Sequence, residues 1–277
     1  MKRSVYYLII LAASWLMAGC SGQEKEAMTR LALAGNLYEE NKWQAARNEI
    51  DSIRAQYPAQ AKVLRKALEL TRLIEIKEAE RNIAYCDSLL PVRQAEAKDV
   101  AKGFVFEKDS AYEEAGNYLR PQQTVERNVE RNYIRCGVNE KGEMYLTSVY
   151  FGSRPVNHTG IRVSTKDGLF AQTNPIAYDG GLNYRFEDNG HVSEIVQYKA
   201  EKGADAIKFI YANAKERIKV DYTGGERTYT IYMEEADKQS LVLTYNLAVL
   251  LADVHRLTNE RAKAIKKKTY LEGKLNQ

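Results

Sequence analysis

The sequence has few of the residues that most often carry chemistry: three histidines, three cysteines and two tryptophans among 277 residues. His158, His191 and His255 stand at none of the metal-binding spacings, such as H-E-x-x-H, and we interpret each as an ordinary surface or helix-flank histidine. Glycine-rich phosphate-binding motifs and the nucleophile elbow G-x-S-x-G are also absent. The sequence therefore predicts no catalytic residue, no metal site and no cofactor.

An excess of charge of one sign is also lacking. Lys and Arg number 41 against 37 Asp and Glu, which gives a formal net charge of +4. A balance this small does not predict binding to nucleic acid. Five prolines and 17 glycines are too few for a collagen-like or low-complexity chain, and 44% hydrophobic residues are typical of a folded protein. The length allows one large domain or two moderate ones.

The hydrophobic run near the N-terminus is too short to span a membrane. Lys2 and Arg3 precede apolar residues from Val5 to Ala18, interrupted only by Ser14. A membrane-spanning helix needs about 20 apolar residues, whereas basic residues followed by a short apolar run are typical of a secretory signal. We therefore expect residues 1–19 to be a signal peptide.

The end of this run carries a cleavage pattern. Leu16-Met17-Ala18-Gly19-Cys20 resembles the lipobox of bacterial lipoproteins, with Met17 where Leu is usual. The alternative is a plain signal peptide with a cysteine at its cleavage site. The resemblance implies that Cys20 becomes the first mature residue and carries acyl chains, which makes the membrane a partner through the lipid. Ser21 replaces the Asp of inner-membrane retention, so the resemblance implies the bacterial cell envelope, at either side of the outer membrane.

Apolar residues at helical spacing predict two helices between Ala27 and Pro58, with a turn near Asn41 and a stop at Pro58. Their small and large positions resemble one tetratricopeptide repeat, with Ala34 and Ala46 as the small residues that let the helices approach; the matching positions are Leu33, Ala34, Leu37, Ala46, Ile50, Ile53 and Pro58. One repeat cannot bury its own apolar face, so we expect this hairpin to pack on the segment that follows.

The next segment, 59–102, has an apolar stripe and no glycine, which predicts one long helix, continuous or interrupted near Pro91. Together with the hairpin it forms a helical region over 20–102. Residues 103–130 mix aromatic residues with polar turns, and we interpret them as a connector to the next part of the chain.

From residue 131 to 235 the hydrophobic period changes from 3.6 to 2, which predicts antiparallel strands. Asn139–Gly142, Lys166–Gly168, Asp188–Gly190 and Thr223–Gly225 supply hairpin turns. Regular spacing of these turns predicts a meander that forms a small sandwich or half-open barrel. We expect strands at 131–138, 143–151, 159–165, 181–187, 191–198, 205–212, 217–222 and 228–234.

Residues 236–273 return to helical spacing and predict a long C-terminal helix. We expect it either to pack antiparallel against the 59–102 helix or to lie across the open face of the sheet. Seven basic residues between Arg256 and Lys274 could meet anionic lipid or an acidic partner, but cations also suit the negative end of a helix dipole, and we favour the dipole. The whole pattern predicts an α+β fold.

Two cysteines remain after Cys20. In an oxidising compartment Cys86 and Cys136 could form a disulfide across 50 residues. The alternative is two buried free thiols, one on the helix and one on a strand. Spacing alone does not choose between them.

Three functions follow from these features. The first is a non-enzymatic lipoprotein, an interaction or structural module that binds another envelope protein through the helical hairpin or the tyrosine-rich sheet. The alternative is binding of a carbohydrate or small ligand on a row of exposed tyrosines, Tyr184, Tyr198, Tyr211 and Tyr229, since ten of the 19 tyrosines lie between Tyr133 and Tyr232. A hydrolase with an unrecognised site is the least supported. The layout also resembles uncharacterised lipoproteins of Gram-negative anaerobes, for which the resemblance implies no activity.

Overall fold

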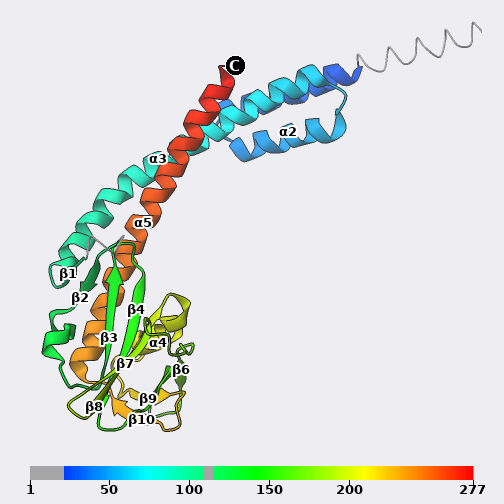
Figure 1. The fold of residues 1–277 in the computed structure, drawn as a ribbon. Coiled ribbons are helices and arrows are strands. Elements are labelled where there is room, and N and C mark those ends of the chain that lie inside the picture. The colour runs from blue at the N-terminus through cyan, green and yellow to red at the C-terminus, as the bar shows by residue number, and fades with distance from the viewer. Residues whose placement is uncertain (1–21, 109–114, 277) are drawn as a thin grey trace, which may run out of the picture. The chain divides into compact units, whose positions relative to one another are not determined.

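The structure is a computed structural model, and it describes residues 22–108 and 115–276. The signal segment and Cys20 lie outside the described residues. The chain divides into two compact units: the first holds the chain up to Asp87 and from Glu260 onward, and the second runs from Ser88 to Asn259. Two long helices, α3 (Ala61–Ala101) and α5 (Glu235–Leu275), contribute residues to both units. The predicted α+β class is confirmed (Figure 1).

The first unit begins with the predicted helical hairpin. Residues 22–39 are helical, and α2 covers Trp43–Gln56. Asn41 takes a φ of 60° in the turn between them, a left-handed conformation in which Asn is enriched. Helix α2 ends before Pro58, because a residue that precedes proline is disfavoured in the helical region. Both predicted helices and their turn are confirmed.

Small residues bring the hairpin onto α3. Ala34 and Ala46 are fully buried and share one apolar cluster with Ile50, Ala67 and Ile74. Because an alanine side chain is a single methyl group, the backbones of the helices can approach closely at these positions. Helix α3 thus covers the apolar face of the hairpin, as the sequence predicted. Leu33 is 46% exposed and does not fill this seam.

The C-terminal part of α5 pairs with α3 inside the first unit. Arg261 bonds Asp87, Lys268 Nζ lies 2.9 Å from Glu80 Oε1, and Arg72 Nη1 donates to the carbonyl of Lys274 at 3.0 Å. Residue numbers rise along one helix while they fall along the other, so the pairing is antiparallel. Basic residues at the end of α5 therefore contact acidic residues of α3.

Helix α3 runs without a break from Ala61 to Ala101, although Pro91 lies inside it. Of the two forms expected from the sequence, the continuous helix is the one observed. Proline removes one backbone donor and crowds the preceding turn. We attribute the tolerance of Pro91 to the packing of the rest of this 41-residue helix.

The second unit contains two antiparallel sheets. The larger has the strand order β1-β2-β3-β4-β8-β7, and the smaller has β10-β9-β5-β6. The order departs from a simple meander, because β4 pairs with β8 and the intervening β5 and β6 belong to the smaller sheet. The strands are β1 (Val105–Glu107), β2 (Asn117–Leu119), β3 (Tyr133–Asn139), β4 (Met144–Gly152), β5 (Gly160–Ser164), β6 (Phe170–Gln172), β7 (Asn183–Asp188), β8 (His191–Lys199), β9 (Lys219–Thr223) and β10 (Tyr229–Tyr232).

The four predicted hairpin turns are confirmed. They join β3 to β4, β5 to β6, β7 to β8 and β9 to β10. Between β7 and β8, Asn189 and Gly190 have φ values of 49° and 76°. Two consecutive residues with positive φ are what a two-residue hairpin of the right twist requires.

Two sequence predictions about this unit are wrong. The connector 103–130 is more than a linker: its described residues, 103–108 and 115–130, supply β1, β2 and two short 3₁₀ helices, Pro121–Gln123 and Val125–Arg127. Residues 205–212 are helical and belong to α4 (Glu201–Ala212), because Ala206, Ile207 and Ile210 recur at helical spacing and are buried together. Strand β6 was not predicted.

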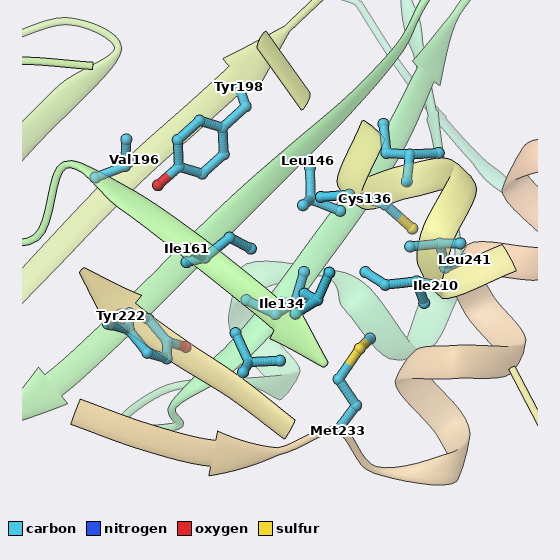
Figure 2. Packing of buried hydrophobic residues seen from close by; sticks show 14 of the residues in the cluster. Ile134, Cys136, Leu146, Ile161, Val196, Tyr198, Ile210, Tyr222, Met233 and Leu241 are labelled. Carbon is cyan, nitrogen blue, oxygen red and sulfur yellow. The ribbon is translucent and has the colours of Figure 1, made fainter. Parts of the chain in front are cut away.

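The core of the second unit lies where the two sheets, α4 and α5 meet. Figure 2 shows Leu146 and Tyr198 of the larger sheet beside Ile161 of the smaller one, with Ile210 of α4 and Leu241 of α5 close by. These residues are at most 1% exposed. Burial of an aliphatic side chain of this size stabilises a fold by about 1.5 to 3 kcal/mol.

Within the second unit, α5 contacts both structures expected of it. Leu241 joins the core of the sheets, and Leu247 packs with Val138 of β3 and Val100 of α3. Among the described residues, α5 is the one helix long and apolar enough to cross a membrane by length and composition. A core helix passes the same test, and Leu241, Leu247 and Ala248 of α5 are buried against strands of the second unit.

Candidate functional site

The four candidate tyrosines do not form a row. Tyr198 on β8 is fully buried in the core and cannot stack on a ligand, because it lies on the inner face of the sheet. Tyr211 lies on helix α4, and Tyr229 lies on β10 of the smaller sheet. Tyr184 on β7 is 38% exposed. The prediction of a shared tyrosine surface is therefore wrong, because period 2 was assigned to a helical segment and the strands divide between two sheets.

The two cysteines are free. Cys86 is buried on α3 in the first unit, and Cys136 is buried on β3 in the second. Burial raises the pKa of the Cys136 thiol to about 12, although the hydrogen bond with Thr244 favours the thiolate. The possible disulfide is not formed, and the alternative of two buried thiols is the observed one.

The strongest cluster of reactive side chains is a buried line of hydrogen bonds. Nδ1 of His158 lies 2.7 Å from Oε2 of Glu194, and Nε2 lies 2.8 Å from Oγ of Ser148. Ser148 Oγ lies in turn 3.2 Å from the hydroxyl of Tyr198. The order of serine, histidine and carboxylate is that of a hydrolase triad.

Glu194 is held as a carboxylate. Burial by itself would raise its pKa, but the hydrogen bonds from the His158 ring and from the backbone N–H groups of Asn157 and His158 outweigh burial and lower the pKa to about 2. A carboxylate at Oε2 requires His158 to donate from Nδ1. The interpretation of His158 as a surface or helix-flank residue is wrong, since its side chain is fully buried.

This cluster has no route to a substrate. Ser148, His158, Glu194 and Tyr198 all have 0% exposure. The carboxylate also receives backbone N–H groups from Val156, Asn157 and His158, so it fixes the segment that leads into β5. The cluster therefore joins the inner face of the larger sheet to the start of the smaller one.

A cavity of the second unit lies elsewhere. It has a volume of about 870 Å³, and its walls come from β1 to β4, β8, α4 and α5. Pockets of about 300 to 1,000 Å³ are typical of small-ligand sites. Its lining comes from both faces of the larger sheet: the helix side, with Ile207, Val249 and Ala252, belongs to α4 and α5, which pack on the inner face, and the strand side, with Asn117, Arg135 and Gln197, is polar.

The strand side belongs to the face of the sheet opposite the core. Cys136, Leu146 and Tyr198 are directly paired and point into the core. Successive side chains of a strand alternate between faces. The next set along these strands, Gly137, Tyr145 and Lys199, is also directly paired and therefore lies on the outer face.

Tyr145 occupies the space above Gly137. A Cβ atom on residue 137 would lie 2.3 to 2.9 Å from three atoms of the Tyr145 phenol group. Glycine is therefore required for the ring to rest on the backbone of β3. The half-buried Tyr145 ring forms part of the cavity wall beside Lys199.

Hydrogen-bonding capacity remains unused at this face. Nε of Arg135 and Oγ1 of Thr147 are buried and have no hydrogen-bond partner in the part of the chain that the structure describes. The two residues are directly paired across β3 and β4, and Gln197 is paired with Thr147 on the other side. Buried polar atoms usually have a partner, and each one without a partner calls for an explanation.

The cavity was missed from the sequence. Two of its walls, β1 and β2, fell in the segment interpreted as a connector, and Ile207 and Lys208 fell in a predicted strand. The sequence around Arg135, Gly137 and Tyr145 shows the alternation of a strand, but alternation does not tell which face of the sheet the helices cover. Within residues 22–108 and 115–276, no group of His, Cys, Asp and Glu side chains is arranged to hold a metal ion.

Comparison of the chain with models of protein families, with curated proteins and with solved structures finds no significant match.

Proposed function

We propose that this protein is a lipid-anchored, non-catalytic protein of a bacterial envelope that binds a small ligand in the 870 Å³ cavity of its second unit. The observation that carries the proposal is the cavity itself. Its size suits a small ligand, and polar side chains gather around the Tyr145 ring where the cavity meets the outer face of the larger sheet. In this proposal the aromatic residue that contacts the ligand is Tyr145, in place of the four tyrosines expected from the sequence.

The proposal assigns no catalysis to the protein. Ser148, His158 and Glu194 have the order of a triad, but a general base must come within hydrogen-bond reach of its substrate. All three side chains are fully buried, and none of them lines the cavity. The cluster is better explained as a structural link between the two sheets.

Binding is tested by titrating a panel of neutral and acidic oligosaccharides into the protein in a calorimeter. The Tyr145→Ala variant is expected to bind about fivefold or more weakly, because an aromatic contact contributes about 0.5 to 1.5 kcal/mol beyond burial of its area. Tyr184→Ala is the matched control, since Tyr184 is exposed on the same sheet outside the cavity. Equal losses in both variants would contradict the proposed site.

Anchoring is supported by the sequence from Leu16 to Cys20 and is tested separately. Cells that express the protein are grown with radiolabelled palmitate and fractionated. Label is expected in the wild type and in Cys86→Ala but not in Cys20→Ala, which should leave the membrane fraction. Because two or more acyl chains give stable anchoring, a Cys20→Ala protein that stays in the membrane fraction would contradict the lipid anchor.

A second candidate function is binding of another envelope protein by the first unit. It is favoured by large apolar side chains that remain exposed on the helices: Met28, Leu33, Leu68 and Leu73. A photocrosslinking amino acid at residue 33 is expected to capture a partner in cells. The same group at Gln44, an exposed polar position, is the control, and equal capture at both positions would argue against the apolar surface.

A further inference from the structure

Aromatic and cationic side chains lie next to each other in the cavity of the second unit. Tyr145 and Lys199 are directly paired across β4 and β8, so their Cβ atoms are about 4.5 to 5.5 Å apart. The Tyr145 ring rests above Gly137, where no side chain competes for the space. A flat ligand ring that stacked on Tyr145 would therefore lie within reach of the Lys199 ammonium.

The charges around the cavity are mainly positive. Lys108, Arg135, Lys199 and Lys208 stand among its lining residues against two carboxylates, Glu107 and Glu143. Glu143 already accepts a hydrogen bond from Asn139, at 2.7 Å. Lys108 already bonds Glu140, at 3.4 Å. The cations that remain are Arg135 on β3 and two exposed lysines, Lys199 at the end of β8 and Lys208 within α4.

Lys199 and Lys208 have no ion-pair partner among the described residues. Both side chains are exposed at the cavity, one at the last residue of β8 and one on α4. Arg135 adds a buried Nε without a hydrogen-bond partner within the described chain. Lys208 belongs to α4, which packs on the inner face, whereas Arg135 and Lys199 share the outer face with Tyr145. A guanidinium and an ammonium group on one face match an anionic group.

We infer that the ligand of this cavity is an acidic saccharide, with a sugar ring on Tyr145 and a carboxylate near Lys199 and Arg135. This inference rests on the proposed function, because it names the class of ligand for the same cavity. A sugar presents apolar C–H groups on its ring faces and hydroxyl groups at its edge. The first suit the Tyr145 ring, and the second suit Gln197 and Asn117, which also line the cavity.

The test compares two probes that differ only in charge: a short oligogalacturonate and the same oligosaccharide with its carboxylates methyl-esterified. The acid form is expected to bind about tenfold more tightly at low salt, and the difference should shrink as salt is added. Lys199→Gln should remove most of that difference, so that the acid and the ester bind with similar affinity. Lys215→Gln is the control, because Lys215 is exposed outside the cavity.

The outcomes separate the inference from the function on which it rests. If the ester binds as tightly as the acid, the acidic ligand is wrong while the small-ligand function stands. If neither probe binds at millimolar concentration, the saccharide class is wrong, and the calorimetric panel decides the function. If inorganic sulfate displaces the acid form and Tyr145→Ala has no effect, the cavity binds anions without a sugar ring, which also overturns the inference.

Discussion

Glu194 and His158 form a contact sealed inside the second unit, with Nδ1 of the histidine 2.7 Å from Oε2 of the glutamate and no exposed surface on either side chain. The same carboxylate accepts three backbone N–H groups from residues 156 to 158. One side chain of β8 thus determines how the chain enters β5. This relationship explains why a triad-like cluster can be structural.

The first prediction concerns the acid stability of this contact. The pKa of Glu194 is about 2 in the folded state, against about 4.3 in an unfolded chain, so its ionisation stabilises the fold by about 3 kcal/mol at neutral pH. That stability is fully present above pH 4.3 and is lost as the pH falls toward 2. In urea unfolding, Glu194→Gln should have a lower free energy of unfolding than the wild type at pH 7. Between pH 5 and pH 2 its free energy of unfolding should fall less than that of the wild type. If the stability of Glu194→Gln depended on pH as that of the wild type does, the lowered pKa of Glu194 would be contradicted.

The second prediction concerns reactivity of Ser148. Because its side chain is fully buried, a fluorophosphonate probe should not label the native protein. Ser148→Ala is the control, and mass spectrometry of tryptic peptides reads the result. Labelling that occurs in the wild type and disappears in Ser148→Ala would show that the cluster is accessible and would favour a hydrolase.

The third prediction concerns the thiols. Protein that carries Cys20→Ala and has been purified without reductant should contain two alkylatable cysteines after unfolding, Cys86 and Cys136. In the native state Cys136 should react slowly, because it is buried and its pKa is raised to about 12. Iodoacetamide labelling followed by mass spectrometry counts the labelled cysteines in the unfolded protein and in the native protein. A mass lower by two hydrogen atoms, without alkylation, would show a disulfide.

The fourth prediction compares two glycines in hairpin turns of the second unit, one between β3 and β4 and one between β5 and β6. Gly142 has a φ of 82°, and a Cβ there would lie 2.3 Å from the backbone nitrogen of Ala252 on α5. Gly168 has a φ of 86° and nothing within 4 Å of such a Cβ. Gly168→Ala should cost about 1 kcal/mol through backbone strain alone, and Gly142→Ala more than about 2 kcal/mol, since helix backbone cannot move aside. Equal losses in thermal unfolding would mean that the β3–β4 turn does not pack on α5.

Local patterns predicted most of the fold correctly. Ala34 and Ala46 marked the helical seam, and the Asn-Gly turn at residues 189–190 marked a hairpin. Both signals depend on neighbours in sequence. The strand prediction for residues 205–212 was wrong because a short apolar run fits both the helical period and the strand period. The short strands β1 and β2 were not predicted, because three residues are too few to show the alternation of a strand.

The candidate site could not be predicted in the same way. Its walls come from strands and helices up to 145 positions apart, from Glu107 to Ala252. Sequence periodicity places Tyr145 on one face of β4 but does not tell which face α5 covers. His158 and Glu194 are 36 residues apart, and their contact depends on the crossing between two sheets. Such relationships follow from tertiary packing.

The most direct measurement of the central claim is nuclear magnetic resonance of ¹⁵N-labelled protein during addition of the oligogalacturonate. We expect the largest amide shift changes at Gly137, Tyr145 and Lys199, and we expect Gly137→Ala, which displaces the Tyr145 ring, to abolish them. Shift changes confined to β9 and β10 or to the first unit would contradict a ligand site in this cavity.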